Sequence, residues 1–200
     1  MKDFLIPKAA IFDFDGTLFD SMWVWTQLDQ DFLRAFGVEP PPDIGREVEA
    51  MTILQACQYF RSRFGLAESA ERLMERMLEM TAQAYARQIQ PFGWALDYLP
   101  RLARRETPAA IVTAGHENHV RAALARCGLE RYFSAVLTPE NTGLTKAQPE
   151  IFQLAARRLQ TPPADCLVFE DSLHAAQAAR RAGCSVALMG PDNRPHIRQD

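Results

Sequence analysis

Two aspartates stand close together where an apolar segment of the chain ends. Asp13 and Asp15 follow the run Ala9–Phe12, and Gly16 comes next. Such a run is typical of a strand buried on both faces of a parallel sheet. Ligands bind beyond the carboxyl ends of these strands, and a glycine lets the chain turn back over that edge. One carboxylate could then attack phosphorus while the other handles protons, or the pair simply caps a turn or forms part of a calcium loop.

Two later segments add groups that could hold a phosphate. Residues 109–113 form another apolar strand pattern that ends in Thr113, and the small residue Ala114 follows. The threonine hydroxyl and the backbone N–H groups after it could bind phosphate oxygens. Lys146 lies just before a predicted helix whose first turn is marked by Pro149. A lysine in such a place is often only solvated, so its position alone does not assign it to a site.

A third segment points to a metal ion. Residues 166–170 form a buried-strand pattern that stops in two adjacent acids, Glu170 and Asp171, and Ser172 is placed to cap the helix that follows. Paired carboxylates at a strand end suit a hard cation such as Mg²⁺, which prefers oxygen ligands.

In this order and spacing, the segments resemble the four motifs of the haloacid dehalogenase superfamily, in its phosphatase branch with a helical cap, which also contains β-phosphoglucomutase and phosphoglycolate phosphatase. The resemblance covers nearly the whole chain. It implies an Mg²⁺-dependent phosphatase in which Asp13 is the nucleophile, forming an aspartyl phosphate, and Asp15 is the general acid and base. It further implies that Thr113, Ala114 and Lys146 bind the phosphoryl group.

The same resemblance implies a magnesium site. Asp171 would bind Mg²⁺ together with Asp13 and the Asp15 carbonyl, and Glu170 would be a direct ligand or a neighbour that supports one.

Two departures from the family pattern refine the expected reaction. True dehalogenases carry a non-acidic residue at the position of Asp15, so this acid favours phosphate esters as substrates. β-Phosphoglucomutase has a histidine in the segment leading into its cap, where this chain has Trp25. A hydrolase is therefore favoured over a mutase. A mutase, or a catalytically idle relative that only binds a phosphorylated ligand, remains the alternative.

The spacing of apolar residues predicts two domains. Strand patterns give way to helical periodicity over residues 20–90, which predicts an all-helical cap inserted into a Rossmann-like catalytic core of residues 1–19 and 91–200. We predict an α/β core with five parallel strands and helices on both faces, in which the polar tail after Met189 leaves one edge of the sheet bare. The predicted strands are 9–12, 109–113, 134–138, 166–170 and 184–189, and the predicted core helices are 91–105, 117–127, 149–160 and 173–182.

Within the predicted cap, three long helices are expected. They cover about 23–36, a segment after Thr52 as the N-cap, and about 69–87, with residues 40–45 as a stiff proline-rich loop. Because the core motifs contact only phosphate and metal, the cap must recognise the rest of the substrate. Trp25 and Arg46 are the candidates, although a tryptophan in a helix is more often core and an arginine more often solvated.

Composition restricts the partners. The chain has 200 residues, 48% of them hydrophobic, and a formal net charge of −3. It has no basic run, no signal-length apolar start and no membrane-length apolar stretch, so neither nucleic acid nor membrane is an expected partner. We expect a cytoplasmic monomer or weak dimer that acts on a small phosphorylated metabolite. The four cysteines lack metal-type spacing and are expected to be reduced thiols.

Overall fold

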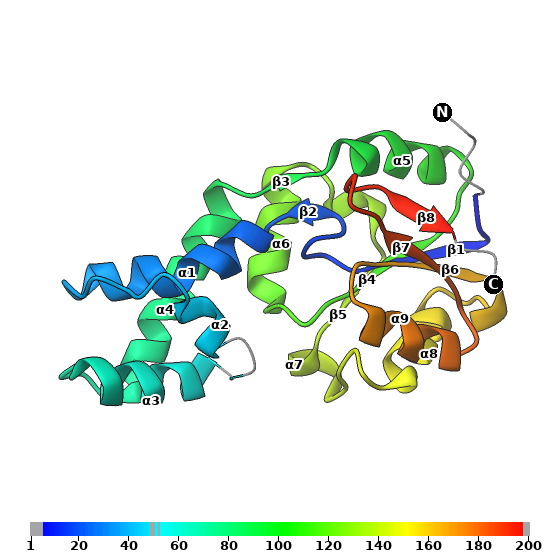
Figure 1. The fold of residues 1–200 in the computed structure, drawn as a ribbon. Coiled ribbons are helices and arrows are strands. Elements are labelled where there is room, and N and C mark those ends of the chain that lie inside the picture. Colours follow the sequence, from blue (N-terminus) through cyan, green and yellow to red (C-terminus); the bar gives the residue numbers. More distant parts are fainter. Residues whose placement is uncertain (1–5, 49–50, 52, 198–200) are drawn as a thin grey trace. The chain divides into compact units, whose positions relative to one another are not determined.

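The computed structural model describes residues 6–48, 51 and 53–197, and the chain forms two compact units (Figure 1). Met1–Asp20 and Ile89–Asp200 form the first, which we call the core unit. Ser21–Gln88 form the second, which we call the helical unit.

The core unit is built on a parallel sheet. Strand β1 (Ala9–Phe12) lies between β4 (Ala109–Val112) and β6 (Cys166–Glu170), and the sheet extends to β5 (Ala135–Leu137) on one side and β7 (Ser185–Met189) on the other. All of these neighbours pair in parallel. β1 is fully buried because both faces of this central strand are covered. The five predicted parallel strands are therefore confirmed.

The prediction of a bare edge was wrong. A sixth strand, β8 (Pro195–Ile197), pairs antiparallel with β7. The tail reverses in a turn in which Gly190 N–H donates to the Arg194 carbonyl at 2.8 Å, with Asn193 in the left-handed region at φ 53°. A left-handed asparagine is common in such turns. The polar tail thus returns along β7 and satisfies the backbone groups that this edge would otherwise expose.

Helices cover both faces of the sheet (Figure 1). On one face, α8 (Pro149–Arg158) and α9 (Leu173–Arg181) pack through small residues into a cluster with alternate strand residues such as Ile11 and Val168. On the other face, rings of α5 (Gly93–Arg104) stack on the strands, with Trp94 centred 5.5 Å from Phe169. The core unit also contains α6 (Glu117–Arg126), α7 (Pro139–Thr142) and the 3₁₀ turns η1 (Glu130–Tyr132) and η2 (Pro163–Asp165).

The helical unit, as far as the structure describes it, consists of four helices: α1 (Met22–Ala35), α2 (Ile44–Val48), α3 (Ile53–Phe64) and α4 (Ala70–Arg87). The three long ones follow the predicted ranges closely, and Ser69 caps α4 by accepting a bond from Arg72 N–H at 3.3 Å. Thr52, the predicted cap of α3, lies outside the described residues. The short α2 was not predicted, because its start falls within the segment expected to be a stiff loop. The unit has its own core around buried residues such as Phe32, Phe60 and Leu73.

A small antiparallel pair joins the two points where the chain leaves and re-enters the core unit. β2 (Phe19–Asp20) pairs with β3 (Gln90–Pro91), with Asp20 opposite Gln90. Phe92 N–H also donates to the Leu18 carbonyl at 2.9 Å. Both connections are thereby held to each other within the core unit.

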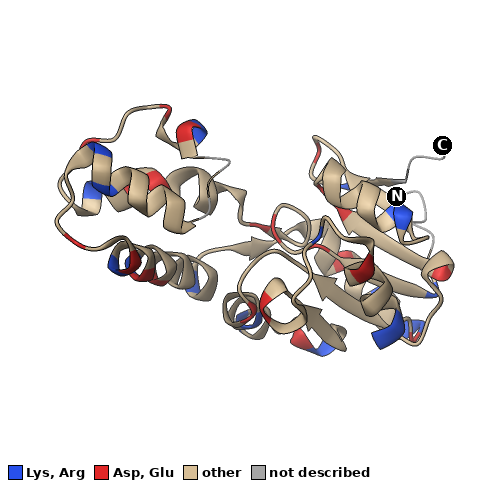
Figure 2. Cartoon of the chain, turned by 90° about the horizontal axis from the view of Figure 1, so that it is seen from below, with Lys and Arg blue, Asp and Glu red and all other residues tan. Residues whose placement is uncertain are grey.

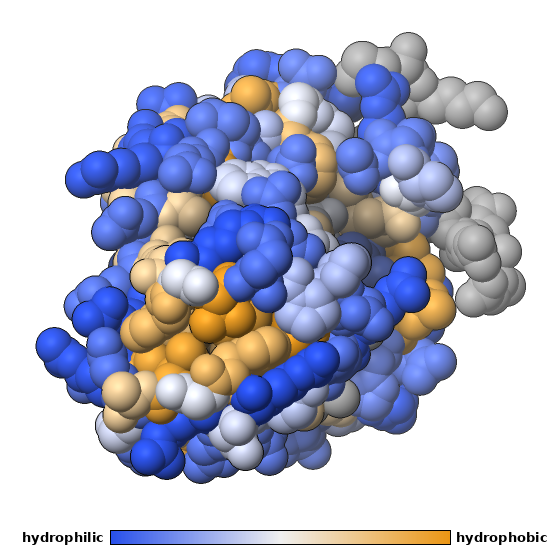
Figure 3. Space-filling view, turned by 60° about the vertical axis from the view of Figure 1, so that its left-hand side comes forward, coloured by the Kyte–Doolittle hydropathy of each residue, from blue (hydrophilic) through white to orange (hydrophobic). Residues whose placement is uncertain are grey.

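The surface has a mixed character. Acidic and basic residues are interspersed along the ribbon (Figure 2). Figure 3 shows one area where hydrophobic residues reach the surface, bordered by hydrophilic ones. Among the described residues, no helix combines the length and hydrophobicity needed to cross a bilayer. The four cysteines are free thiols.

Candidate active site

The motif residues gather at the carboxyl edge of the sheet. Residues that end neighbouring strands lie side by side there, because Phe12 is paired with both Ile111 and Phe169. Just beyond the strands, Asp13 N–H donates to the Phe169 carbonyl at 2.9 Å, and Thr113 N–H donates to the Leu137 carbonyl at 3.0 Å. The backbone is thus held in sheet-like order up to the first residues of the site.

Asp13 is the best anchored of these residues. Its carboxylate is only 3% exposed. One oxygen, Oδ1, lies 2.6 Å from Lys146 Nζ, and the other, Oδ2, accepts a hydrogen bond from Thr17 Oγ1 at 3.0 Å. Both oxygens therefore have a partner, which fixes the carboxylate in one orientation.

The ion pair with Lys146 does not offset the effect of burial on the pKa of Asp13. Burial raises the pKa of Asp13 to about 6, Lys146 opposes this effect, and the charge of Asp171 adds to it. Ionised Asp13 therefore destabilises the folded state, and ionisable groups with shifted pKa values of this kind are frequent at functional sites.

Asp15 reaches the loop that follows β4. Gly16, at φ 73°, turns the chain, and its N–H donates to the Phe19 carbonyl at 3.0 Å. A Cβ built on Gly115 would lie 3.4 Å from both Asp15 Oδ2 and Thr113 Oγ1. The Asp15 carboxylate, the threonine hydroxyl and this glycine thus meet at one point, with Ala114 exposed beside them. Thr113 itself is buried, and its hydroxyl accepts a bond from Gly115 N–H at 3.0 Å.

Lys146 bridges two carboxylates. Its Nζ lies 2.6 Å from Asp13 Oδ1 and 2.8 Å from Glu170 Oε2, and it donates to Glu170 Oε1 at 3.0 Å. Glu170 is fully buried and also accepts a bond from Ser172 N–H at 3.1 Å. Burial lowers the pKa of Lys146, but the two carboxylates outweigh it and raise the pKa above its ordinary value. Lys146, whose side chain is 14% exposed, is therefore an ion-paired ammonium rather than the solvated lysine that is common in such loops.

The lysine loop is held from two sides. Thr145 N–H donates to Gln148 Oε1 at 2.8 Å, which closes a turn around Lys146. Arg181, at the end of α9, donates to the Ala147 carbonyl at 3.1 Å. These contacts position the ammonium without contributing to the site themselves.

The acidic residues form a cluster suited to a divalent cation. One carboxylate oxygen from each of Asp13, Glu170 and Asp171 lies within 4.8 Å of the others, and Asp171 is exposed. Burial and the charge of Asp13 raise the pKa of Glu170 well above its ordinary value, against the effect of Lys146. Three carboxylates face a single ammonium, so the cluster has an excess of negative charge. All-oxygen donors with surplus negative charge fit a hard divalent cation.

The two predicted specificity residues lie in the helical unit. Trp25, on α1, is half-buried against that unit's hydrophobic core and makes an edge-on contact with Tyr85 at 6.4 Å between ring centroids. Arg46, on α2, is exposed. Their role in substrate recognition stays a prediction.

Sequence reasoning missed Thr17. It is completely buried and donates to the carboxylate of Asp13 four residues before it. Its position in the tight turn after Gly16 was a usable signal, because a hydroxyl there can reach back to the start of the turn.

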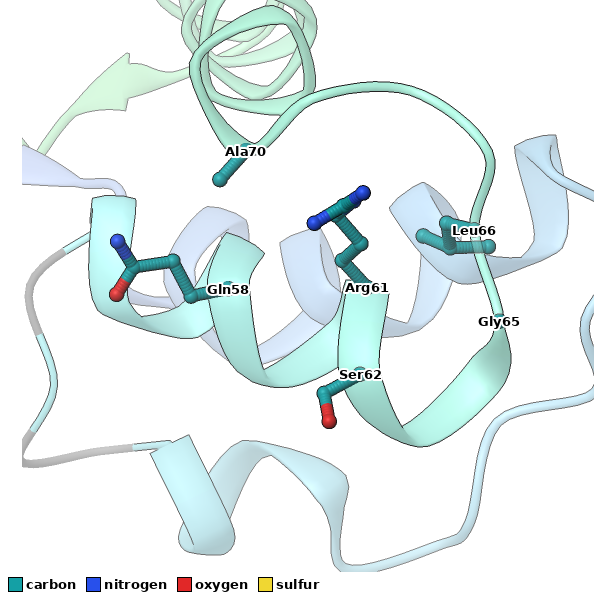
Figure 4. A pocket seen from close by; sticks show the side chains of 6 residues that line it. All are labelled: Gln58, Arg61, Ser62, Gly65, Leu66 and Ala70. Atoms are coloured by element: carbon teal, nitrogen blue, oxygen red, sulfur yellow. The ribbon is translucent and has the colours of Figure 1, made fainter.

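A separate hollow lies in the helical unit (Figure 4). Its volume is about 340 Å³. Figure 4 shows the lining residues: Gln58, Arg61 and Ser62 on α3, and Gly65, Leu66 and Ala70 from the turn that leads into α4. Its polar residues are exposed, and it contains none of the motif residues.

Comparison with known proteins identifies the family. The model of the haloacid dehalogenase-like hydrolases matches residues 10–189. The chain therefore belongs to the haloacid dehalogenase-like hydrolases, in the phosphatase branch of that superfamily, which makes it a phosphoric monoester hydrolase.

Individual relatives agree with this placement. The phosphorylated carbohydrates phosphatase of Thermotoga maritima is 23% identical over 176 residues, covering 88% of this chain and 82% of that protein. The fructose-1-phosphate phosphatase YqaB of Escherichia coli is 28% identical over 183 residues, covering 88% and 92% respectively. The crystal structure of CbbY from Rhodobacter sphaeroides in complex with phosphate superposes with a TM-score of 0.76 at 21% identity, covering 97% of this chain and 89% of that one. This structural likeness concerns the fold.

Proposed function

We propose that this protein is an Mg²⁺-dependent phosphatase that hydrolyses small phosphorylated carbohydrates through an aspartyl-phosphate intermediate on Asp13. The observation that carries the proposal is the environment of Asp13. Its carboxylate is buried, held by Lys146 at 2.6 Å and Thr17 at 3.0 Å, and adjoins the acidic cluster with Glu170 and Asp171. A merely structural aspartate would not need a second acid, a paired ammonium and surplus negative charge around it.

The first step is attack on phosphorus. A carboxylate oxygen of Asp13 forms a bond to phosphorus while the bond from phosphorus to the leaving oxygen breaks. Asp15, in its protonated form, gives its proton to that oxygen, so the product leaves as an alcohol. Lys146, the Thr113 hydroxyl and the N–H groups around Ala114 would hold the phosphoryl oxygens and stabilise the charge that develops on them.

The second step regenerates the enzyme. Asp15, now ionised, accepts a proton from a water molecule as that water attacks phosphorus. The bond between phosphorus and Asp13 breaks, inorganic phosphate leaves, and both aspartates return to their starting states. One acid thus serves both half-reactions, which explains why its carboxylate lies beside the phosphate-binding loop after β4.

A metal ion completes the proposed site. Asp13, Asp171 and the Asp15 carbonyl would hold Mg²⁺, with Glu170 as a further ligand or as a support for one. When bound, the ion neutralises negative charge on the phosphoryl group and on the carboxylates that face it.

The proposed substrate class rests on the relatives. The phosphatases of Thermotoga maritima and Escherichia coli described above are named for phosphorylated carbohydrates and for fructose 1-phosphate. We propose that the helical unit acts as the cap, that Trp25 and Arg46 contribute to the choice of substrate, and that the motif residues of the core unit supply the chemistry.

The test is phosphate release from p-nitrophenyl phosphate and a panel of sugar and alditol phosphates, with Mg²⁺ and with EDTA. We expect turnover that EDTA abolishes and Mg²⁺ restores, and Asp13→Asn should fall below about a hundredth of the wild-type rate. The matched control is Asp165→Asn, at a surface aspartate whose side chain is 35% exposed and paired with Lys8. Wild-type inactivity on every ester, or an Asp13→Asn rate above a tenth of wild type, would refute the proposal.

A further inference from the structure

A histidine and a glutamate form a pair on the loops that follow β4 and β5. His116 Nδ1 contacts Glu140 Oε1, and Glu117 N–H donates to Glu140 Oε2 at 3.3 Å. Glu140 thus ties the start of α6 to α7, and one of its oxygens holds the imidazole through Nδ1.

The pair is supported by a second layer of bonds. Asn141 Nδ2 donates to Glu117 Oε2 at 2.8 Å, and Arg121 Nε donates to Glu117 Oε1 at 2.7 Å. The charge of Glu117 is therefore matched by Arg121, whereas Glu140 interacts with the imidazoles of His116 and His119. Burial raises the pKa of Glu140, but bonds from His116 and from the backbone outweigh it and hold the pKa below its ordinary value. The carboxylate is therefore ionised near neutral pH.

The residue that precedes this pair in the chain, Gly115, lies beside the proposed proton donor Asp15. In the proposed mechanism Asp15 protonates the leaving oxygen, and a Cβ on Gly115 would lie only 3.4 Å from Asp15 Oδ2. His116 follows Gly115 directly, and Glu140 contacts it. The first atoms of the leaving group therefore lie near this part of the core unit.

The pair offers acceptors. A neutral imidazole that donates through Nδ1 accepts through Nε2, and a carboxylate only accepts. Such a surface favours hydroxyl groups, which can donate, and disfavours a second phosphate or a carboxylate, which cannot.

We propose that His116 and Glu140 select phosphate esters whose leaving group carries hydroxyl groups and no second anionic group. This inference rests on the proposed function and names the feature of the substrate that these two residues recognise. Glu140 is a positioning and charge-selecting residue rather than a catalytic one. It acts on the part of the leaving group beyond the reacting oxygen, and it holds the imidazole of His116 in place.

The test compares fructose 1-phosphate with fructose 1,6-bisphosphate at pH 8, with p-nitrophenyl phosphate as the internal standard. For the wild type we expect kcat/KM to favour the monophosphate by about tenfold or more. Glu140→Lys should lower this preference by about tenfold and Glu140→Gln by about threefold, in line with the interaction of unit charges several ångströms apart in a partly solvated site. Turnover of p-nitrophenyl phosphate, which has no second anionic group on its leaving side, should change less than twofold.

The matched control is Glu130→Lys, the same charge change at an exposed glutamate 3.5 Å from Arg121. It should leave the preference unchanged. If neither sugar phosphate is turned over, their inhibition constants against p-nitrophenyl phosphate replace kcat/KM in the same comparison.

A wild-type preference near one, or an equal loss of preference in Glu130→Lys and Glu140→Lys, would overturn the inference while leaving the phosphatase proposal intact. Absence of wild-type turnover of every ester, p-nitrophenyl phosphate included, would overturn the proposed function and this inference with it.

Discussion

Replacing Asp13, the proposed nucleophile, should stabilise the metal-free protein. Burial raises the pKa of Asp13 from 3.8 to about 6 despite its contact with Lys146. The folded state therefore binds a proton at this group more tightly than the unfolded state does. The stabilisation is fully present below about pH 4 and is lost as the pH rises through about 6.

The expected size of the effect follows from this shift. At about 1.4 kcal/mol per pKa unit, ionised Asp13 costs the metal-free fold about 3 kcal/mol at pH 7.5 and about 1 kcal/mol at pH 4.5. Asp13→Asn keeps the shape of the side chain and removes the charge. We therefore expect the variant to be more stable than the wild type by about 3 kcal/mol at pH 7.5, with about 2 kcal/mol of this gain lost at pH 4.5.

The assay is urea unfolding in EDTA, followed by circular dichroism at both pH values. Asp165→Asn serves as the control, because it makes the same change at a partly exposed surface aspartate. Its stability should differ from the wild type by less than about 0.5 kcal/mol. If Asp13→Asn destabilises the metal-free protein at pH 7.5, or if its gain is the same at both pH values, the electrostatic account of this site is wrong.

The other predictions concern catalysis. Asp15→Asn should slow phosphoenzyme formation by about 10²-fold or more for an alkyl phosphate and by much less for p-nitrophenyl phosphate, whose leaving group needs little protonation; equal losses in rapid-quench measurements would exclude the proton-donor role. Lys146→Met should lower kcat/KM by about 10²-fold or more, as removal of a charge-stabilising group typically does, whereas Lys8→Met on the surface should leave steady-state kinetics unchanged. Trp25→Ala or Arg46→Ala should alter the ranking of sugar phosphates by more than they alter p-nitrophenyl phosphate turnover, and an unchanged ranking across the panel would contradict a role in specificity.

The sequence predicted the parallel sheet well because its strands are buried on both faces. The runs Ala9–Phe12 and 166–169 are continuously apolar, and this pattern can be recognised without knowing which strands lie beside them. β8 has no such pattern: it is three residues long and begins with a proline. It forms because the edge of β7 is open and the chain turns back at Gly190, and neither fact can be read from the residues of the strand.

The site shows the same limit at the level of side chains. Strand ends placed Asp13, Glu170 and Asp171 on one edge, because parallel strands end together. Lys146 is different: its spacing is equally compatible with a solvated loop, and only the resemblance to the family assigned it to phosphate. Its position between two carboxylates depends on how its loop folds, which involves a contact from Arg181 far along the chain.

The pairing of β2 with β3 has a consequence for how such a protein can change over evolutionary time. Because Asp20 lies opposite Gln90, the first and last residues of the helical unit leave from adjacent points of the core unit. A segment whose ends are this close can be shortened, exchanged or duplicated while the remaining chain is closed by a short hairpin turn. The sheet and the residues at its edge then keep their connectivity. The helical unit, which we propose selects the substrate, can thus diverge at its own rate, while the core unit with the motif residues stays the same.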